Sequence, residues 1–411
     1  MNLDDEEQAM LAGERGSAVQ QAIRLQVSVG DYFGARDMVR VGSVHISGDV
    51  EELGDAGVEY LERMGSLGAS CVVPTLTDPR GAEFRGARLR QDPAAIEIER
   101  RTIAAYGAMN FRQCNNCIIY QTTLQPRRGE HLAWGDTGSV IYANSVFGAR
   151  SNFEAGPSAL AASLTGRTPR YGFHLDGVRK ANVVVQVEGR ISDLAEWGAL
   201  GCVVGRQMRG YWDVPVFTGL EDEPDSDALK HLGAALASFG STAMFHIAGL
   251  TPEAATLSQA LSDARARREL IVPTGGLEEA FARFDLPFGK VDLVVFSAPQ
   301  LSAAELASVA DAFAGREVHE GVRVFVTAPS EVVAVIEADG VRDRLQAAGV
   351  EILVDVCFYL MTPRLLAALN SFSTLVTNSA KLANIMTGHG YAVKLRRLSG
   401  CVDAALRGVA D

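Results

Sequence analysis

The second half of the chain alternates short apolar runs with longer segments of helical character. The runs 293–296 (LVVF) and 322–326 (VRVFV) are apolar at nearly every position. Strands of this kind are typical of a parallel sheet that helices cover on both faces. Ser302, followed by Glu305, has the capping-box spacing that begins a helix. The sequence therefore predicts a doubly wound α/β domain over 226–362, joined by right-handed crossovers.

The rest of the chain requires further domains. With 411 residues, the chain is too long for one small core. The run 221–227 is acidic, contains proline and predicts an exposed linker. We therefore expect an N-terminal α/β region at 1–225, and we expect 363–411 to pack back on it.

Charge and cysteine content restrict the partners and the compartment. The net charge of −12 argues against a nucleic-acid partner, because a phosphate backbone needs a basic surface. The first residues, MNLDDEEQAM, do not resemble a signal peptide, and no apolar run is long enough for a membrane span. The six cysteines are too few for a disulfide framework in a chain of this length. We predict a cytoplasmic protein.

The stretch 129–174 combines polar side chains with repeated glycines. Glycines at 129, 135, 138, 148, 156 and 166 interrupt any steady helical or strand period. Glycines allow tight turns and close approach, so polar groups from several short pieces can converge. A solvated surface loop is the alternative. We favour a binding or catalytic wall, with these candidates: His131, Asp136, Asn144, Ser145, Arg150, Asn152, Arg167 and His174.

Further candidates stand where predicted strands end, which is where α/β proteins place ligand groups. We assign candidate catalytic roles to His45, His131, Asp136, Ser145 and Lys381. Candidate substrate-binding residues are Thr75, Asn144, Arg150, Asn152, Arg167, His246, Asn378 and Ser379. Arg150 and Arg167 are suited to hold a carboxylate by bidentate hydrogen bonds. For His45 and His246 a purely structural hydrogen bond is the competing interpretation.

Two cysteines lie close together in the sequence. Cys114 and Cys117 have the two-residue spacing with which thiolates bind one metal centre. Such a pair needs further ligands from elsewhere, and two packed core cysteines are the alternative.

Several separate motifs occur in one order along the chain. They are EEQAMLAGERG near the start, SVHISG at 43–48, VVPTLTDPR at 72–80, GEHLAW at 129–134, ANSVFGARSN at 143–152, FHIAGLTPEA at 245–254, DVC at 355–357 and TNSAK at 377–381. This series resembles the aconitase X family nearly from end to end. The resemblance implies an aconitase-like multi-domain α/β fold and dehydration of a small carboxylated hydroxy acid, such as a hydroxyproline-type substrate. It also implies an iron–sulfur cluster held by three cysteines.

The chain departs from the family pattern at the implied cluster. The resemblance makes Cys117 and Cys357 two of the three ligands. The third is expected in a GCPH-like motif after 291–296, where this chain has Ser297 and, in place of the histidine, Gln300. A serine oxygen is a poor ligand for a soft iron–sulfur centre. Cys114 is the candidate substitute ligand.

The resemblance also implies a swivelling domain that carries the catalytic serine, and nothing in the 411 residues resembles that domain. We therefore expect the domain to be absent from this chain, so that either a separate small subunit supplies it or the protein works without it. Three hypotheses remain: an aconitase X-type hydro-lyase, a repurposed cluster-independent enzyme that isomerises, eliminates or cyclises a carboxylated substrate, and a non-catalytic scaffold. We rank them in that order. Residues from 39–174 and from 355–381 should meet in one cleft.

Overall fold

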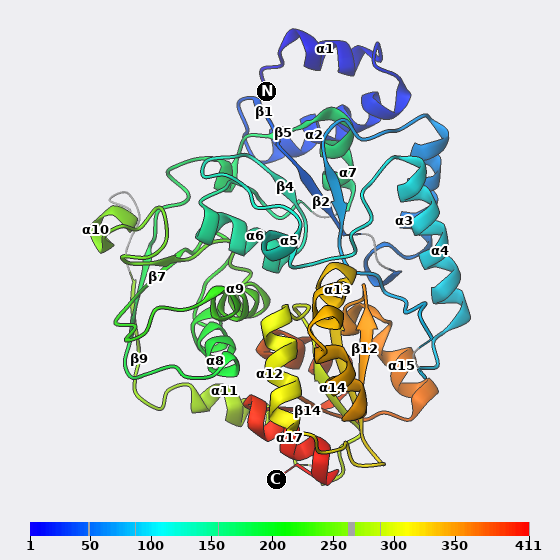
Figure 1. The fold of residues 1–411 in the computed structure, drawn as a ribbon. Helices are drawn as coiled ribbons and strands as arrows, with labels where there is room; N and C mark the ends of the chain where they lie inside the picture. Colours follow the sequence, from blue (N-terminus) through cyan, green and yellow to red (C-terminus); the bar gives the residue numbers. More distant parts are fainter. Residues whose placement is uncertain (48–49, 87, 155, 262–267, 288, 411) are drawn as a thin grey trace.

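Three parallel sheets, each with its own helices, follow one another along the chain (Figure 1). The structure is a computed structural model, and it describes residues 1–410 apart from 48–49, 87, 155, 262–267 and 288. Gly48 of the SVHISG motif therefore lies outside the described part. In Figure 1 the first sheet lies at the top, the second at the left and the third at the bottom.

The first part of the chain is built on the small parallel sheet β3-β2-β4, beside an antiparallel pair of β1 with β5. Its strands are β1 (Met38–Arg40), β2 (Val44–Ile46), β3 (Thr75–Thr77), β4 (Ala133–Trp134) and β5 (Arg167–Pro169). Its helices are α1 (Asp5–Ala12), α2 (Ser17–Tyr32), α3 (Val50–Ser66), α4 (Pro93–Ala108), α5 (Ile119–Thr122), α6 (Thr137–Tyr142) and α7 (Pro157–Thr165). A π-helical turn at Ala143–Phe147 follows α6.

The second part is a parallel sheet in the order β8-β7-β6-β9. Its strands are β6 (Val183–Val187), β7 (Pro215–Thr218), β8 (His246–Ile247) and β9 (Arg268–Val272). Its helices are α8 (Leu194–Gly205), α9 (Ser226–Gly240), α10 (Leu257–Ala260) and α11 (Glu278–Arg283). Helices α8 and α9 pack closely, and Gly201 makes this possible because a β-carbon there would lie 2.7 Å from the Leu232 carbonyl oxygen.

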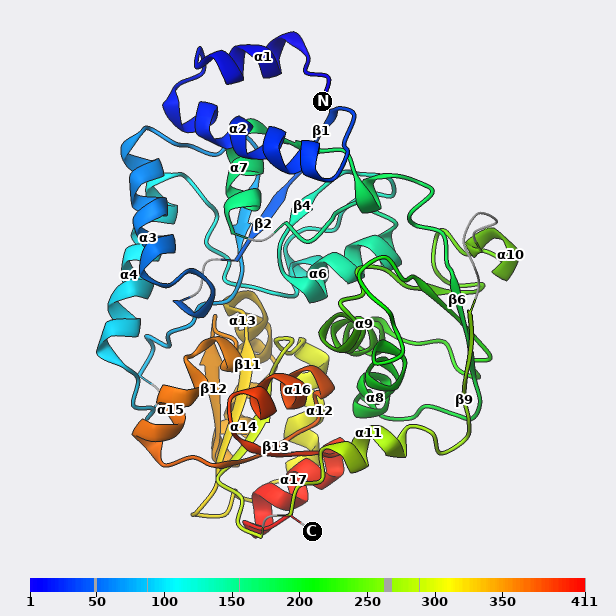
Figure 2. The same cartoon turned by 180° about the vertical axis from the view of Figure 1, so that it is seen from behind.

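The third part is a five-stranded parallel sheet in the order β12-β11-β10-β13-β14. Its strands are β10 (Leu293–Phe296), β11 (Arg323–Ala328), β12 (Val350–Val354), β13 (Thr374–Thr377) and β14 (Ala392–Leu395). Its helices are α12 (Ala303–Phe313), α13 (Ser330–Ala338), α14 (Val341–Ala347), α15 (Pro363–Asn370), α16 (Ala380–Gly388) and α17 (Leu398–Arg407). Helices α12, α14 and α17 lie in front of this sheet in Figure 1, and α16 lies in front in the reverse view of Figure 2.

The order of these strands places a topological switch point at β10. From β10 the chain moves outward through β11 to β12, and then returns to the other side of β10 as β13. Ligands of doubly wound sheets bind beyond the carboxyl ends of the strands at such a point. The residues that follow β10, β12 and β13 therefore converge there. The predicted capping box of Ser302 and Glu305 is present at the start of α12.

The predicted α/β class and the doubly wound sheet are confirmed, but the sheets divide the chain differently from the predicted boundaries. Strands within 226–362 belong to two sheets, because β8 pairs with β7 and β9 pairs with β6. The segment 363–411 contributes β13 and β14 to the C-terminal sheet, while its helix α16 packs on α8 and α9. The physical reason is that sheet pairing joins strands distant in sequence, which a change in composition near 226 does not reveal. No helix among the described residues is long and apolar enough to cross a membrane.

Candidate active site

Two cysteines and a serine from distant parts of the chain meet at the switch point. Ser297 directly follows β10, and its Oγ lies 3.5 Å from the Sγ of Cys357, which follows β12. The Cys357 thiol also hydrogen-bonds the Cys117 thiol, which comes from the first part of the chain. All three side chains are buried. The predicted meeting of the 39–174 and 355–381 regions is therefore present at this centre.

The two thiols differ in acidity. Burial raises the pKa of Cys117 well above its usual range, and the neighbouring Cys357 raises it further. Burial also acts to raise the pKa of Cys357, but hydrogen bonds from Cys117 and Ser297 and the positive charge of Lys381 outweigh it and lower that pKa. Cys357 is therefore the more acidic of the two thiols.

A buried ion pair lies beside the thiols. Lys381, at the start of α16, places its Nζ 3.5 Å from Oδ1 of Asp136, and the two side chains are only 7% and 5% exposed. The other carboxylate oxygen, Oδ2 of Asp136, accepts a hydrogen bond from the Ser139 amide and caps α6. Burial acts to lower the pKa of Lys381, but Asp136, Cys117 and Cys357 outweigh it, so the pKa is raised and the ammonium stays charged.

His45 and Asp78 complete the centre from the ends of β2 and β3. His45 is fully buried, which lowers its pKa and keeps its ring neutral. Its Nε2 lies 2.9 Å from the carbonyl oxygen of Asn116 and 3.6 Å from Oδ1 of Asp78. A carbonyl only accepts, so Nε2 carries the ring proton. Nδ1 is then an acceptor, and it has no hydrogen-bond partner among the described residues.

The structure does not bring the two candidate arginines to this centre. The Nε of Arg167 donates to Oε1 of Glu7 at 2.9 Å, and both side chains are buried. Arg150 donates to the carbonyl oxygen of His174 at 2.9 Å and pairs with Asp176. Both guanidinium groups therefore hold structure together away from the thiols.

Most other candidates from the glycine-rich stretch also bind protein groups. His131 Nδ1 lies 2.9 Å from His174 Nδ1, and burial together with nearby arginines lowers the pKa of His131 to about 4. The other candidates hydrogen-bond backbone groups. Asn144 bonds the carbonyls of Ser151 and Ala243, and Ser145 bonds the amide of Phe245. Asn152 bonds the backbone of Tyr171 and Phe173, and His246 bonds the carbonyl of Arg179. The contacts of Asn144 with Ala243 and of Ser145 with Phe245 dock the first part of the chain on the second, and those of His131 and Asn152 hold the first part together.

Three further candidates lie near strand ends but differ in position. Thr75 is at the beginning of β3 and its hydroxyl bonds the Val73 carbonyl. Ser379 caps α16 and donates to the carbonyl of Ala298 at 2.6 Å. Asn378 and Ser297 both line a cavity of about 190 Å³. This cavity reaches the centre from the side of the second part of the chain.

Sequence reasoning missed Asp78 and Tyr359 as members of the centre. Lys381 Nζ lies 5.6 Å from the centroid of the Tyr359 ring. Asp78 follows β3 directly, and β3 pairs with the strand that carries His45. That adjacency was a usable signal, because carboxyl ends of neighbouring parallel strands share one edge.

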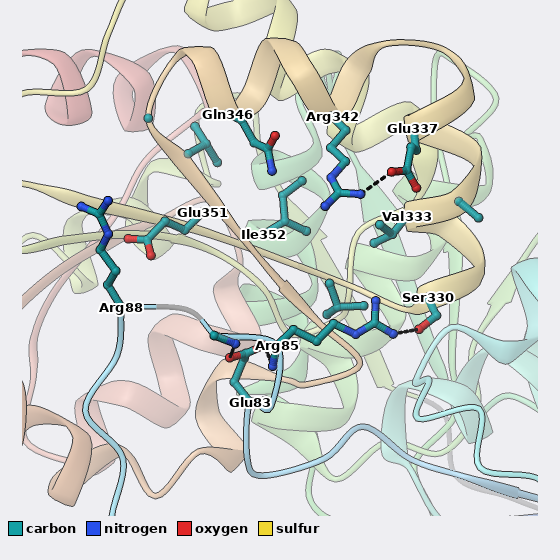
Figure 3. A pocket seen from close by; sticks show the side chains of 15 residues that line it. Glu83, Arg85, Arg88, Ser330, Val333, Glu337, Arg342, Gln346, Glu351 and Ile352 are labelled. Atoms are coloured by element: carbon teal, nitrogen blue, oxygen red, sulfur yellow. Dashed lines mark hydrogen bonds and ion pairs between the residues drawn. The ribbon is translucent and has the colours of Figure 1, made fainter.

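A wider groove lies outside this centre. It has a volume of about 660 Å³ and is lined by Glu83, Arg85, Gly86 and Arg88, by the edge strand β12 and by helices α13 and α14 (Figure 3). In Figure 3, Arg342 pairs with Glu337 and Arg85 reaches Ser330. None of the predicted site residues lines the groove, so its size does not make it the candidate active site.

Comparison with known proteins agrees with this geometry. Residues 1–177, 181–282 and 291–407 match the models of the aconitase X first, second and third domains. The chain belongs to the aconitase X family. The three matches also coincide with the three sheets, which accounts for the revised boundaries.

Relatives and a solved structure match nearly the whole chain. The phosphomevalonate dehydratase large subunit of Thermococcus kodakarensis is 31% identical over 98% of this chain and 100% of the relative. The cis-3-hydroxy-L-proline dehydratase of Pseudomonas aeruginosa is 36% identical over 99% of this chain and 70% of the relative. The crystal structure of Thermococcus kodakaraensis aconitase X in its holo-form superimposes with a TM-score of 0.88 at 31% identity, covering 98% of this chain and all of that one.

The residues at the centre do not fit a cluster held by three thiolates. Ser297 Oγ accepts hydrogen bonds from Thr327 Oγ at 2.8 Å and from the Phe358 amide at 3.1 Å. Cys114, the candidate substitute, donates to the carbonyl of Thr77, and burial raises its pKa to about 12. Among the described residues, no group of three or more histidine, cysteine or carboxylate side chains is arranged to hold a metal. The donor set therefore consists of the thiols of Cys117 and Cys357 and the hydroxyl of Ser297, which already accepts two hydrogen bonds.

Proposed function

We propose that this chain is the large subunit of a hydro-lyase that removes water from a small carboxylated hydroxy acid. The observation that carries the proposal is the buried triad of Cys357, Lys381 and Asp136 at the switch point of the third sheet. A thiolate beside an ammonium group supplies a proton acceptor and a proton donor within one site. The similarity to named dehydratases supports the same class of reaction.

The proposed reaction assigns one role to each group. The Cys357 thiolate removes the proton next to the substrate carboxylate, and the electron pair forms the carbon–carbon double bond. The hydroxyl group leaves with a proton from Lys381, so that water is the product. Asp136 keeps Lys381 charged until that transfer. His45 is a second proton acceptor at the same centre through its Nδ1, for which the described part of the chain supplies no hydrogen-bond partner.

The charges at the centre favour a substrate that carries an ammonium group. Asp78 and Asp136 are carboxylates, Cys357 acts as a thiolate in the proposed reaction, and Lys381 is positive. A phosphorylated substrate would add about two negative charges to this set, whereas a hydroxyproline-type acid adds a carboxylate and a compensating ammonium. We therefore propose a hydroxyproline-type substrate in preference to a phosphorylated one.

The test offers both substrate types to the purified protein and measures the product of water loss by mass spectrometry. We expect turnover of cis-3-hydroxy-L-proline, its loss in Lys381→Met and Cys357→Ser, and none with phosphomevalonate. Turnover of phosphomevalonate alone would refute the charge argument. Water loss that survives both substitutions would refute the assigned roles.

We further propose that a second, smaller chain completes the enzyme in the cytoplasm. The Thermococcus relative is named a large subunit, and the Pseudomonas relative extends beyond the 70% of its length that this chain matches. The free thiols of all six cysteines fit a reducing compartment. Activity that appears only when a small-subunit chain is added supports this part of the proposal, and full activity of the isolated chain counts against it.

A cluster-independent elimination or isomerisation is the second candidate function. The observation in its favour is the donor set of the centre, in which Ser297 is committed to Thr327 and Phe358. The two candidates differ in the product. A product lighter than the substrate by one water favours the first candidate, and a product of unchanged mass, as an isomerisation gives, favours the second. Activity that follows the iron content would contradict the second candidate and also the roles assigned to Cys357 and Lys381.

A further inference from the structure

The side chain of Gln300 joins two loops that carry the thiols. It is fully buried just after β10. Its Nε2 donates to the carbonyl of Asn115 at 3.2 Å and to the carbonyl of Val356 at 3.2 Å. Its Oε1 accepts a hydrogen bond from the amide of Cys117 at 3.1 Å. Both hydrogens and the oxygen of the side-chain amide therefore form hydrogen bonds, and these bonds link a loop of the first domain to a loop of the third.

The backbone of Gln300 makes two further contacts. Its amide donates to the Sγ of Cys117 at 3.3 Å, and its carbonyl accepts from Nζ of Lys230 at 3.4 Å. Lys230 belongs to α9 of the second domain and is fully buried beside Glu305 and Asp227, with its Nζ 2.9 Å from Oδ1 of Asp227. One residue of the third domain thus hydrogen-bonds both other domains at the thiol pair.

We propose that Gln300 is a positioning residue that holds Cys117 and Cys357 side by side through hydrogen bonds alone. It stands at the position where the family resemblance implies the histidine of the GCPH-like motif. The donor set does not fit a three-thiolate cluster, and the hydrogen bonds of Gln300 already join the two loops without a metal. The inference rests on the proposed function only in taking the thiol pair as the active centre.

The chemistry of the amide explains why glutamine suits this position. A neutral imidazole has one donor and one acceptor, so it cannot supply two donors and one acceptor. A glutamate keeps the acceptor but loses both donors, and a methionine keeps the length but loses all three bonds. These differences provide variants that separate shape from hydrogen bonding.

The first measurement is hydrogen exchange at the Cys117 amide, which bonds Oε1 of Gln300 directly. In Gln300→Met we expect exchange at Cys117 to be at least about tenfold faster, since its buried acceptor is lost. In Gln300→Glu the acceptor remains, so Cys117 should stay protected. The matched control is Gln346→Met, at an exposed glutamine on α14, where no change is expected.

The second measurement reports the thiol pair itself. Mercuric ion bound by two thiolates gives a sulfur-to-mercury absorption band, and Cys117→Ser or Cys357→Ser should remove the contribution of this pair. We expect Gln300→Met and Gln300→Glu to weaken mercury binding at the pair about tenfold, with Gln346→Met unchanged. A glutamine that only fills space would lower the thermal midpoint and leave this band intact. If Gln300→Met does not fold, Gln300→Glu alone decides this point.

The third measurement is the thermal midpoint of the metal-free protein. Because hydrogen bonds hold the loops, chelation should leave the midpoint of the purified protein unchanged. A midpoint that falls on chelation, or wild-type mercury binding in Gln300→Glu, would overturn the proposal. All three measurements are made without substrate, so failure of the hydro-lyase assignment would not affect them.

Discussion

Replacing Lys381 by methionine should strongly destabilise the protein, because it leaves the buried carboxylate of Asp136 without its cation. The two charges are 3.5 Å apart, which corresponds to an attraction of about 5 kcal/mol at an effective dielectric constant of about 20. Removing one partner of a buried pair costs about 3–5 kcal/mol, since the other charge stays buried. We therefore expect Lys381→Met to lower the free energy of unfolding by about that amount.

A double-mutant cycle separates this pair from the rest of the site. Asp136→Asn is the second change, and asparagine can still cap α6 through its side-chain oxygen. The double variant removes both charges, so its loss of stability should be smaller than the sum of the single losses by about 2 kcal/mol or more. Urea unfolding of the four proteins measures this coupling. A coupling below about 0.5 kcal/mol would refute the reasoning that the two groups form a buried ion pair.

Four further results are expected. Ser297→Cys should increase iron and sulfide incorporation on anaerobic reconstitution, measured by metal analysis, and an unchanged iron content would contradict the third-ligand argument. Arg167→Ala should lower the free energy of unfolding by about 3–5 kcal/mol, because Glu7 stays buried without its cation. Arg150 pairs with Asp176, so Arg150→Ala should leave the ligand affinity measured by calorimetry unchanged. Burial raises the pKa of Glu99 to about 7. The full contribution of Glu99 to the free energy of unfolding is therefore present below about pH 4.5. As the pH rises to about 7, the free energy of unfolding falls by on the order of 3 kcal/mol. Glu99→Gln should remove that slope in urea unfolding measured from pH 4.5 to 8.

The class of fold could be predicted from the sequence because its signals are local. The apolar runs that became β10 and β11 have the composition of buried parallel strands, and the capping box of Ser302 is contained in four residues. The domain boundaries could not be predicted in the same way. Strand β13 enters the third sheet by pairing with β10, about 80 residues earlier in the chain, and no local pattern records that partner.

The candidate site was predicted in part, for a related reason. His45, Asp136 and Lys381 stand next to strand ends, and strand ends at a switch point converge whatever the details of packing. Arg150 and Arg167 carry the same chemical signal in the sequence. Their roles depend on partners such as Glu7, far away in the chain, which only the folded structure brings into contact.

Ser297 and Gln300 have to be considered together. Ser297 Oγ accepts from the Phe358 amide, and Gln300 Nε2 donates to the Val356 carbonyl, so both residues fasten the short segment that contains Cys357. Each of these two departures from the implied cluster motif thus comes with a hydrogen bond that orders the same loop. A single change at Ser297 supplies a thiol but removes the hydroxyl that accepts from Phe358, while Gln300 continues to hold the loop. Ser297→Cys should therefore raise the iron content without completing the conversion. A fully metal-held centre requires both positions to change, because the hydrogen-bonded arrangement and the three-thiolate arrangement use the same loop in different ways.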